Sequence, residues 1–122
     1  MKVGVETDKA PKAIGPYSQA IKANGFLFIS GQIPIDPETG SMTAVDAVAQ
    51  TQQVMKNLSA VLEAEGLGFA DVVKTTIFLT DLTEFTRVND AYGAYFESDP
   101  PARATVQVAA LPKGAKVEIE AV

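Results

Sequence analysis

The spacing of apolar residues predicts six strands and two helices along the chain. Strands are expected where apolar and polar residues alternate, or where short runs are rich in β-branched and aromatic residues, at 2–6, 18–24, 26–30, 71–81, 103–109 and 116–122. The dipeptide Asn24-Gly25 predicts a tight hairpin between the second and third strands. The unbroken run "FLFIS" at 26–30 is typical of a strand that is buried on both faces.

A first helix is expected over about 45–65, because apolar residues recur there at helical spacing. These residues are Ala47, Val54, Met55, Leu58, Val61 and Leu62. Thr43 and Asp46 can form a capping box at the start of this helix, or Asp46 can be the N-cap itself. Gly66 predicts the end of the helix.

A second helix is expected over 82–98, with Thr83 as a candidate cap and Pro100-Pro101 as the stop. Its apolar stripe consists of Phe85, Val88, Tyr92, Tyr95 and Phe96. The order of elements, three strands, a helix, a strand, a helix and two strands, predicts a single domain over 1–122. The fold class is α+β, a sandwich with both helices on one face of a mixed sheet.

Polar side chains alternate along each of the last two predicted strands, and they include Arg103, one of only two arginines in the chain. If 103–109 and 116–122 pair as a hairpin, their polar faces can coincide. One side of the sheet then gathers Arg103, Thr105, Gln107, Glu118 and Glu120. Two interpretations stay open: a solvated face with a surface ion pair, or a pocket between subunits in which Arg103 binds a carboxylate.

Composition and charge narrow the classes of function. Apolar residues make up 47% of the chain, enough for a core, yet a chain this short leaves about a third of its unfolded surface exposed, which favours burial between subunits. The formal net charge of −5 and the lack of a cationic cluster argue against a nucleic-acid partner. Because no apolar run reaches the length of a signal or a membrane span, the cytoplasm is the expected location and no membrane partner is expected.

The chain contains no cysteine and no histidine. It therefore has no thiolate nucleophile, no sulfur-ligated metal site and no imidazole base. No calcium-loop, phosphate-loop or dinucleotide-binding motif occurs either, so no metal and no cofactor are expected. Any catalysis has to use carboxylates, hydroxyls, lysine, arginine, backbone dipoles and water.

Several blocks, in this order, resemble the RidA (YjgF) family from about residue 9 to the end of the chain. The blocks are "IGPYSQAI", "FISGQIPIDPETG", "VVKTTIFLTDL", "FTRVNDAYGAYF" and "PPARATVQVAALPKGAKVEIEAV". The resemblance implies a chorismate-mutase-like fold, a homotrimer, and ligand sites in the clefts between subunits. It also implies hydrolysis of reactive enamines and imines, such as 2-aminoacrylate, to 2-keto acids and ammonia.

The resemblance also implies the roles of individual residues. The arginine of "PAR" is Arg103, expected to bind the substrate carboxylate, and the glutamate of "KVEIEA" is Glu118, expected to hold and polarise the attacking water. Spacing alone does not separate Glu118 from Glu120; only the motif does. Further substrate-binding residues implied by the motifs are Tyr17, Ser30, Gly31 and Asn89.

Thr105 stands where many members of the family carry a cysteine, and it is a further candidate for the substrate pocket. This departure excludes a thiol role but not deamination, because hydrolysis of an imine needs water and no covalent nucleophile. The predicted function is therefore a 2-iminobutanoate/2-iminopropanoate deaminase, a scavenger of reactive metabolites whose partners are small 2-imino and 2-keto acids. The alternatives are a trimer that binds small carboxylates without turnover, and a ribonuclease or translation inhibitor, against which the net charge and the missing histidine argue.

Overall fold

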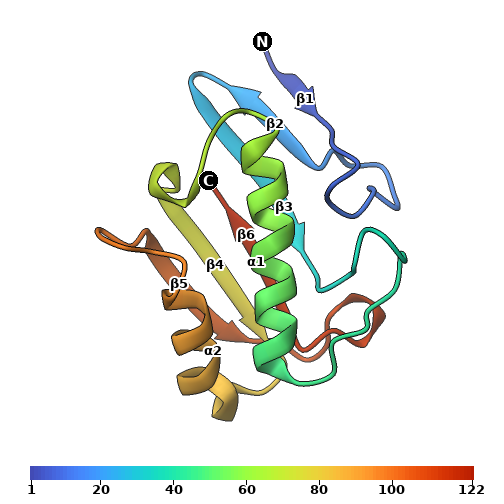
Figure 1. The fold of residues 1–122 in the computed structure, drawn as a ribbon, viewed down its shortest axis with the longest axis vertical. Coiled ribbons are helices and arrows are strands. Elements are labelled where there is room, and N and C mark those ends of the chain that lie inside the picture. The colour runs from blue at the N-terminus through green and yellow to red at the C-terminus, as the bar shows by residue number, and fades with distance from the viewer.

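The computed structural model describes residues 1–122 and shows one six-stranded sheet with the strand order β1-β2-β3-β6-β4-β5. The strands are β1 (Val3–Val5), β2 (Ala20–Ala23), β3 (Phe26–Gln32), β4 (Lys74–Leu79), β5 (Ala102–Gln107) and β6 (Val117–Ala121). The helices α1 (Ala47–Glu63) and α2 (Phe85–Gly93) lie side by side on one face of this sheet (Figure 1). The predicted element order and the α+β sandwich are confirmed.

The positions of the last two strands differ from the prediction. Strand β6 lies between β3 and β4 and is antiparallel to both, whereas β5 forms the edge of the sheet and is parallel to β4. The predicted hairpin of 103–109 with 116–122 is therefore wrong. The reason is that α2 connects β4 to β5 as a crossover, and such a connection places two consecutive strands parallel and adjacent.

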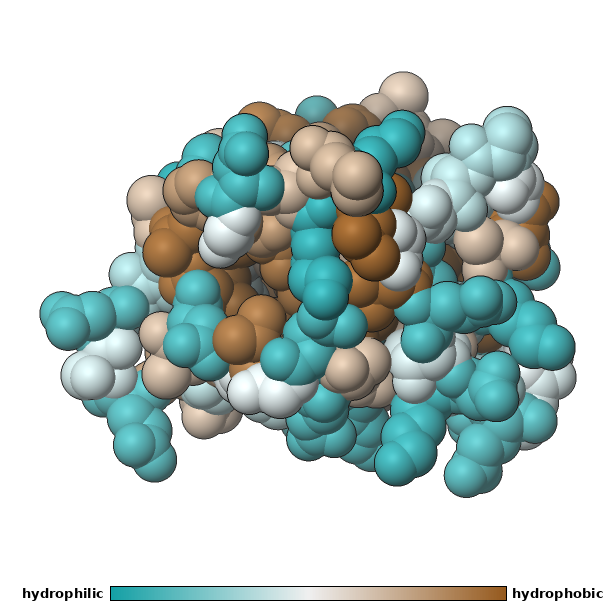
Figure 2. Space-filling model, turned by 90° about the horizontal axis from the view of Figure 1, so that it is seen from above, coloured by the Kyte–Doolittle hydropathy of each residue, from teal (hydrophilic) through white to brown (hydrophobic).

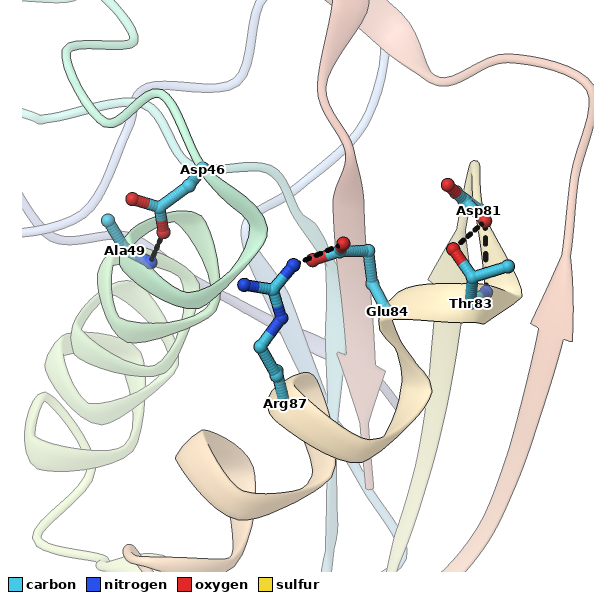
Figure 3. A network of polar contacts seen from close by, with 6 residues as sticks. All are labelled: Asp46, Ala49, Asp81, Thr83, Glu84 and Arg87. Carbon is cyan, nitrogen blue, oxygen red and sulfur yellow. Dashed lines mark hydrogen bonds and ion pairs between the residues drawn. The ribbon is translucent and has the colours of Figure 1, made fainter.

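Helix α1 supplies one wall of the core. Its N-cap is Asp46, whose Oδ1 accepts a hydrogen bond from the backbone N–H of Ala49 at 2.8 Å (Figure 3), so the capping box with Thr43 does not form. The predicted stripe is buried, with Val54, Met55, Leu58 and Val61 at most 1% exposed. After the helix, Gly66 adopts a φ of 70°, the left-handed conformation expected of a helix stop.

Helix α2 is shorter than predicted and begins after a 3₁₀ turn over Leu82–Glu84. Thr83 is not the cap. Instead, the carboxylate of Asp81 accepts hydrogen bonds from the hydroxyl of Thr83 at 2.6 Å and from its N–H at 2.9 Å (Figure 3), and these bonds lower the pKa of Asp81. Tyr95 lies beyond the helix, where it packs against Phe69 with ring centroids 5.4 Å apart.

The face of the sheet opposite the helices is left open. Strand β3 alternates, with Leu27 and Ile29 in the core and with Phe26 and Phe28 on the open face, where they are 53% and 46% exposed. The prediction that this strand is buried on both faces is wrong for the single chain. Seen from above, hydrophobic side chains gather in the upper and central part of the view, while hydrophilic side chains lie along its lower edge (Figure 2).

Neither helix combines the length and the apolar character that a membrane-crossing helix requires.

Candidate functional site

Arg103 lies on the helix side of the edge strand β5. It pairs in register with Thr75 of β4, and Thr75 is buried, so both side chains lie on the face that α2 covers. Its Nη1 donates a hydrogen bond to Oδ1 of Asn89 at 2.6 Å. The guanidinium carbon also lies 5.2 Å from the ring centroid of Tyr92 and 5.6 Å from that of Phe85, within the range of cation–π attraction.

These three partners come from one face of α2. Phe85, Asn89 and Tyr92 are spaced at i, i+4 and i+7, positions that lie above one another on a helix. From the sequence, both aromatic residues were expected in a core stripe, without a connection to Arg103. The signal was present in the sequence, because an asparagine lies between two aromatic residues on the helix face that packs over the next strand.

Arg103 has no acidic partner within the chain. The two ion pairs of the structure join Lys22 to Glu65 at 2.8 Å and Arg87 to Glu84 at 2.6 Å (Figure 3). Every group that holds the guanidinium is neutral, so its charge is not compensated. It borders a cavity of about 420 Å³, lined by Asn89, Tyr92, Gly93, Phe96, Pro100, Pro101 and Arg103.

Thr105 follows Arg103 by two residues on the same face of β5. Its hydroxyl oxygen is buried and has no hydrogen-bond partner. A buried polar atom without a partner is uncommon in folded proteins and requires an explanation. At this position it is a free hydroxyl beside an uncompensated cation.

A second group of predicted residues lies on the open face of the sheet. The side chain of Glu118 extends over Gly31, so closely that a Cβ added to Gly31 would collide with the Glu118 carboxylate. The neighbouring Ser30 donates its hydroxyl proton to the carbonyl of Ser18 at 2.6 Å, and Ser18 follows Tyr17, which is half exposed. The structure thus brings Glu118 against Gly31 and places Ser30 and Tyr17 on the adjoining segments.

The pKa of Glu118 is raised above its ordinary value. Partial burial is the larger cause, because it disfavours the charged form, and the like charge of Glu120 on the same face of β6 adds to it. A carboxylate with a raised pKa holds a proton more readily than an exposed one. This property suits a group that accepts a proton from water and later returns it.

The two groups of residues lie on opposite faces of the sheet. Arg103 pairs with Thr75 of β4, whereas Glu118 pairs with Phe78 of the same strand, and residues three apart on a strand point to opposite sides. The prediction that Arg103, Thr105 and Gln107 share a face with Glu118 and Glu120 is therefore wrong. It followed from the assumed hairpin, whereas in the structure the register of each strand with β4 sets the two faces, with Arg103 level with Thr75 and Glu118 level with Phe78.

Residues 7–122 match the family model described as Endoribonuclease L-PSP. The chain belongs to this family. The resemblance to the RidA (YjgF) proteins, which the family includes, is thereby confirmed.

Solved structures of the Endoribonuclease L-PSP family share the whole fold. YyfA of Yersinia pestis, described as a conserved Rid family protein, superposes with a TM-score of 0.96 at 54% identity, over 99% of this chain and 97% of that one. E. coli TdcF, solved with bound serine, gives a TM-score of 0.93 at 42% identity, over 98% and 95% of the two chains. The Homo sapiens protein named 2-iminobutanoate/2-iminopropanoate deaminase is 49% identical, over 97% of this chain and 86% of its own.

The contact of Glu118 with Gly31 gives a first prediction. In Gly31→Ala the new methyl group displaces the Glu118 carboxylate toward solvent, so the pKa of Glu118 falls toward its ordinary value. The free energy of unfolding changes by no more than about 1 kcal/mol, because a flexible side chain can move. NMR titration of the glutamate carboxyl carbons and urea unfolding measure the two effects. A raised pKa that persists in the variant would show that Gly31 does not set the position of Glu118.

The unpartnered hydroxyl of Thr105 gives a second prediction. Thr105→Val keeps the shape and removes a buried group without a partner, so the free energy of unfolding rises by about 1 kcal/mol. Thr75→Val is the matched control, because it removes a hydroxyl that bonds to Tyr92 at 2.7 Å, and it lowers the same quantity by about 1–3 kcal/mol. Equal losses of stability in both variants would mean that Thr105 has a partner.

Proposed function

We propose that the protein is a 2-iminobutanoate/2-iminopropanoate deaminase, which hydrolyses reactive enamines and imines such as 2-aminoacrylate to 2-keto acids and ammonia. The observation that carries this proposal is the uncompensated guanidinium of Arg103, which is held by neutral groups beside a cavity. Arginine presents a planar fork that matches a carboxylate. The human relative that bears this name supports the choice of reaction.

The active site lies between two copies of the chain. Arg103 and Glu118 lie on opposite faces of one sheet, so a small ligand contacts both only when Glu118 comes from a neighbouring copy. The open face of the sheet, with the exposed Phe26 and Phe28, supplies apolar surface for such a contact. A head-to-tail contact between different surfaces closes into a ring when the rotation between neighbouring copies is a whole fraction of a turn. The ring that the family resemblance implies is a homotrimer.

In this site the substrate carboxylate binds the fork of Arg103, which Asn89 holds in orientation. Thr105 lies two residues further along the same face of β5 and stays a candidate for this pocket, although its hydroxyl is buried in the single chain and does not line the cavity at Arg103. On the neighbouring copy, Glu118 holds a water molecule, and Gly31 leaves the space in which the carboxylate lies. Tyr17 and Ser30 line that side of the cleft. The cytoplasmic location stays a prediction.

Hydrolysis proceeds by addition of water followed by loss of ammonia. The enamine first tautomerises to the imine, whose carbon is electrophilic. Glu118 accepts a proton from the water while the water oxygen bonds to the imine carbon, and the imine nitrogen takes up a proton from the solvent. The proton held by Glu118 then passes to the amino group, and the C–N bond breaks. The added hydroxyl returns a proton to the solvent as the carbonyl of the 2-keto acid forms, ammonia leaves, and no cofactor takes part.

Two other functions have specific support. A trimer that binds small carboxylates without turnover needs Arg103 but not Glu118, and the E. coli TdcF structure with bound serine shows a relative holding a small amino acid. A ribonuclease is suggested by the description of the family model. The net charge of −5 and the lack of a cationic cluster argue against RNA as a ligand.

The test of the function is the release of 2-keto acid from freshly generated 2-aminoacrylate, measured above the uncatalysed rate. Arg103→Lys lowers kcat/KM by at least about tenfold, because a point charge does not reproduce the bidentate fork. Glu118→Gln lowers kcat by about 100-fold or more, because the proton acceptor is lost. The control is Arg87→Lys, which changes the only other arginine, an exposed residue paired with Glu84.

The function is contradicted if the wild-type protein does not accelerate 2-keto acid release. The carboxylate-binding alternative is favoured if the wild type binds 2-keto acids and Glu118→Gln turns over 2-aminoacrylate as fast as the wild type. Ribonuclease activity that persists through purification and disappears in Arg103→Ala would favour the second alternative.

The raised pKa of Glu118 predicts how the activity depends on pH. The carboxylate form is the active one, so kcat falls as the pH drops through a midpoint above the ordinary glutamate pKa. Glu120→Gln removes the like charge that contributes to the shift and moves this midpoint to lower pH. The measurement is kcat against pH for both proteins. Identical acid limbs in the two profiles would show that Glu118 is not the titrating group, or that Glu120 does not act on it.

A further inference from the structure

Tyr92 of α2 contacts both Thr75 of β4 and Arg103 of β5. Its side chain is 4% exposed, and its hydroxyl lies 2.7 Å from the hydroxyl of Thr75, which is 2% exposed. Thr75 is also the residue of β4 that pairs in register with Arg103 of β5. Three neighbouring elements, β4, α2 and β5, therefore each contribute one residue to a connected group, which consists of Thr75, Tyr92 and Arg103.

The bond between Thr75 and Tyr92 fixes the orientation of the ring. A cation is attracted to the face of an aromatic ring, so the benefit depends on the angle that the ring presents. Thr75 is β-branched and has few side-chain conformations, and its strand β4 is paired on both sides, with β6 and with β5. The phenol stays neutral, because burial raises the pKa of Tyr92. The ring thus meets the guanidinium at a fixed angle and brings no opposing charge.

Neutral partners differ from an acidic one in an important way. A carboxylate beside Arg103 would hold the side chain firmly, but it would also compete with any anionic ligand for the fork. Three neutral groups restrict the movement of the guanidinium and leave its charge free to attract a ligand: the rings of Tyr92 and Phe85 and the amide of Asn89. The binding site for an acid is thereby prepared before the acid arrives, which lowers the ordering cost of binding.

We propose that Thr75 and Tyr92 are positioning residues, which hold the guanidinium of Arg103 in the orientation that receives a carboxylate ligand. This inference deepens the proposed function and rests on it for the identity of the ligand as a small 2-keto or 2-imino acid. The Thr75–Tyr92 hydrogen bond then contributes to ligand affinity as well as to the stability of the core.

The test combines a spectroscopic signal with a binding constant. Because the chain has only two arginines, the side-chain Nε–Hε resonances of Arg103 and the exposed Arg87 can be distinguished by NMR with the variant Arg87→Lys. The dissociation constant of pyruvate is measured by titration on the same samples. Two variants are compared with the wild type: Tyr92→Leu, which removes the ring, and the double variant Thr75→Val with Tyr92→Phe, which removes only the hydrogen bond and keeps the volume.

In Tyr92→Leu the resonance of Arg103 is expected to move to the position of an exposed arginine, and the dissociation constant of pyruvate rises by about tenfold. In the double variant the constant rises by about threefold, and the fold is preserved because no hydroxyl is left unpaired. The control is Tyr95→Leu, the same chemical change at a residue that packs against Phe69 and does not contact Arg103. Tyr95→Leu is expected to leave both the Arg103 resonance and the dissociation constant of pyruvate unchanged.

The proposal is overturned if the folded double variant and Tyr92→Leu keep the wild-type resonance and the wild-type constant. It is also overturned if Tyr95→Leu has the same effect as Tyr92→Leu, since the cause is then a general loosening of the core. A failure of the proposed function looks different: Arg103→Ala then binds pyruvate as tightly as the wild type. In that event the Arg103 resonance alone decides whether Tyr92 positions the guanidinium.

Discussion

The guanidinium of Arg103 is held by two aromatic rings and one amide, and by no carboxylate. This arrangement constrains the rest of the site. It requires three residues at i, i+4 and i+7 of α2, and it requires that α2 cross over from β4 to the parallel strand β5. The buried bond between Thr75 and Tyr92 then couples the helix to the sheet at the same register position. A positive charge without a partner is thereby kept at the edge of an acidic protein.

Under the proposed function, the division of the site between the two faces of the sheet means that one chain alone does not form a complete site. Strand β6 carries Glu118 on the open face, and β5 carries Arg103 on the helix face. The same open face presents large apolar residues that no helix covers. In the proposed assembly, one contact between copies both buries that surface and completes the site. In this account, assembly is a condition for catalysis and not only a source of stability.

The sequence predicted the elements well because local patterns determine them. Helix α1 has a regular stripe and an N-cap at Asp46, and the hairpin at Asn24-Gly25 joins β2 and β3, with both residues at positive φ. The element order and the fold class follow from these patterns. The candidate residues came from motifs, and the structure places Arg103 with Asn89, and Glu118 with Gly31.

The pairing of the last strands could not be predicted, because alternation gives the faces of a strand but not its neighbours. A hairpin between strands that are consecutive in the sequence is the simplest expectation. In the structure α2 instead connects β4 to β5 as a crossover, and β6 lies between β3 and β4. Both strands instead pair with β4, in registers that place Glu118 on the face opposite Arg103. The aromatic partners of Arg103 were missed for a related reason: Phe85 and Tyr92 have the spacing of core residues, and only the parallel register shows that they also lie beside a charge.

The sharing of the active site between subunits can be tested by mixing two inactive variants, Arg103→Ala and Glu118→Ala, under conditions in which subunits exchange. If each site takes its arginine from one chain and its glutamate from the next, every mixed ring of three contains one intact site. Random mixing then restores about a quarter of the wild-type rate of 2-keto acid release. If the mixture stays as inactive as its components although mixed rings form, both residues act within one chain, and the proposed sharing of the site between subunits is wrong.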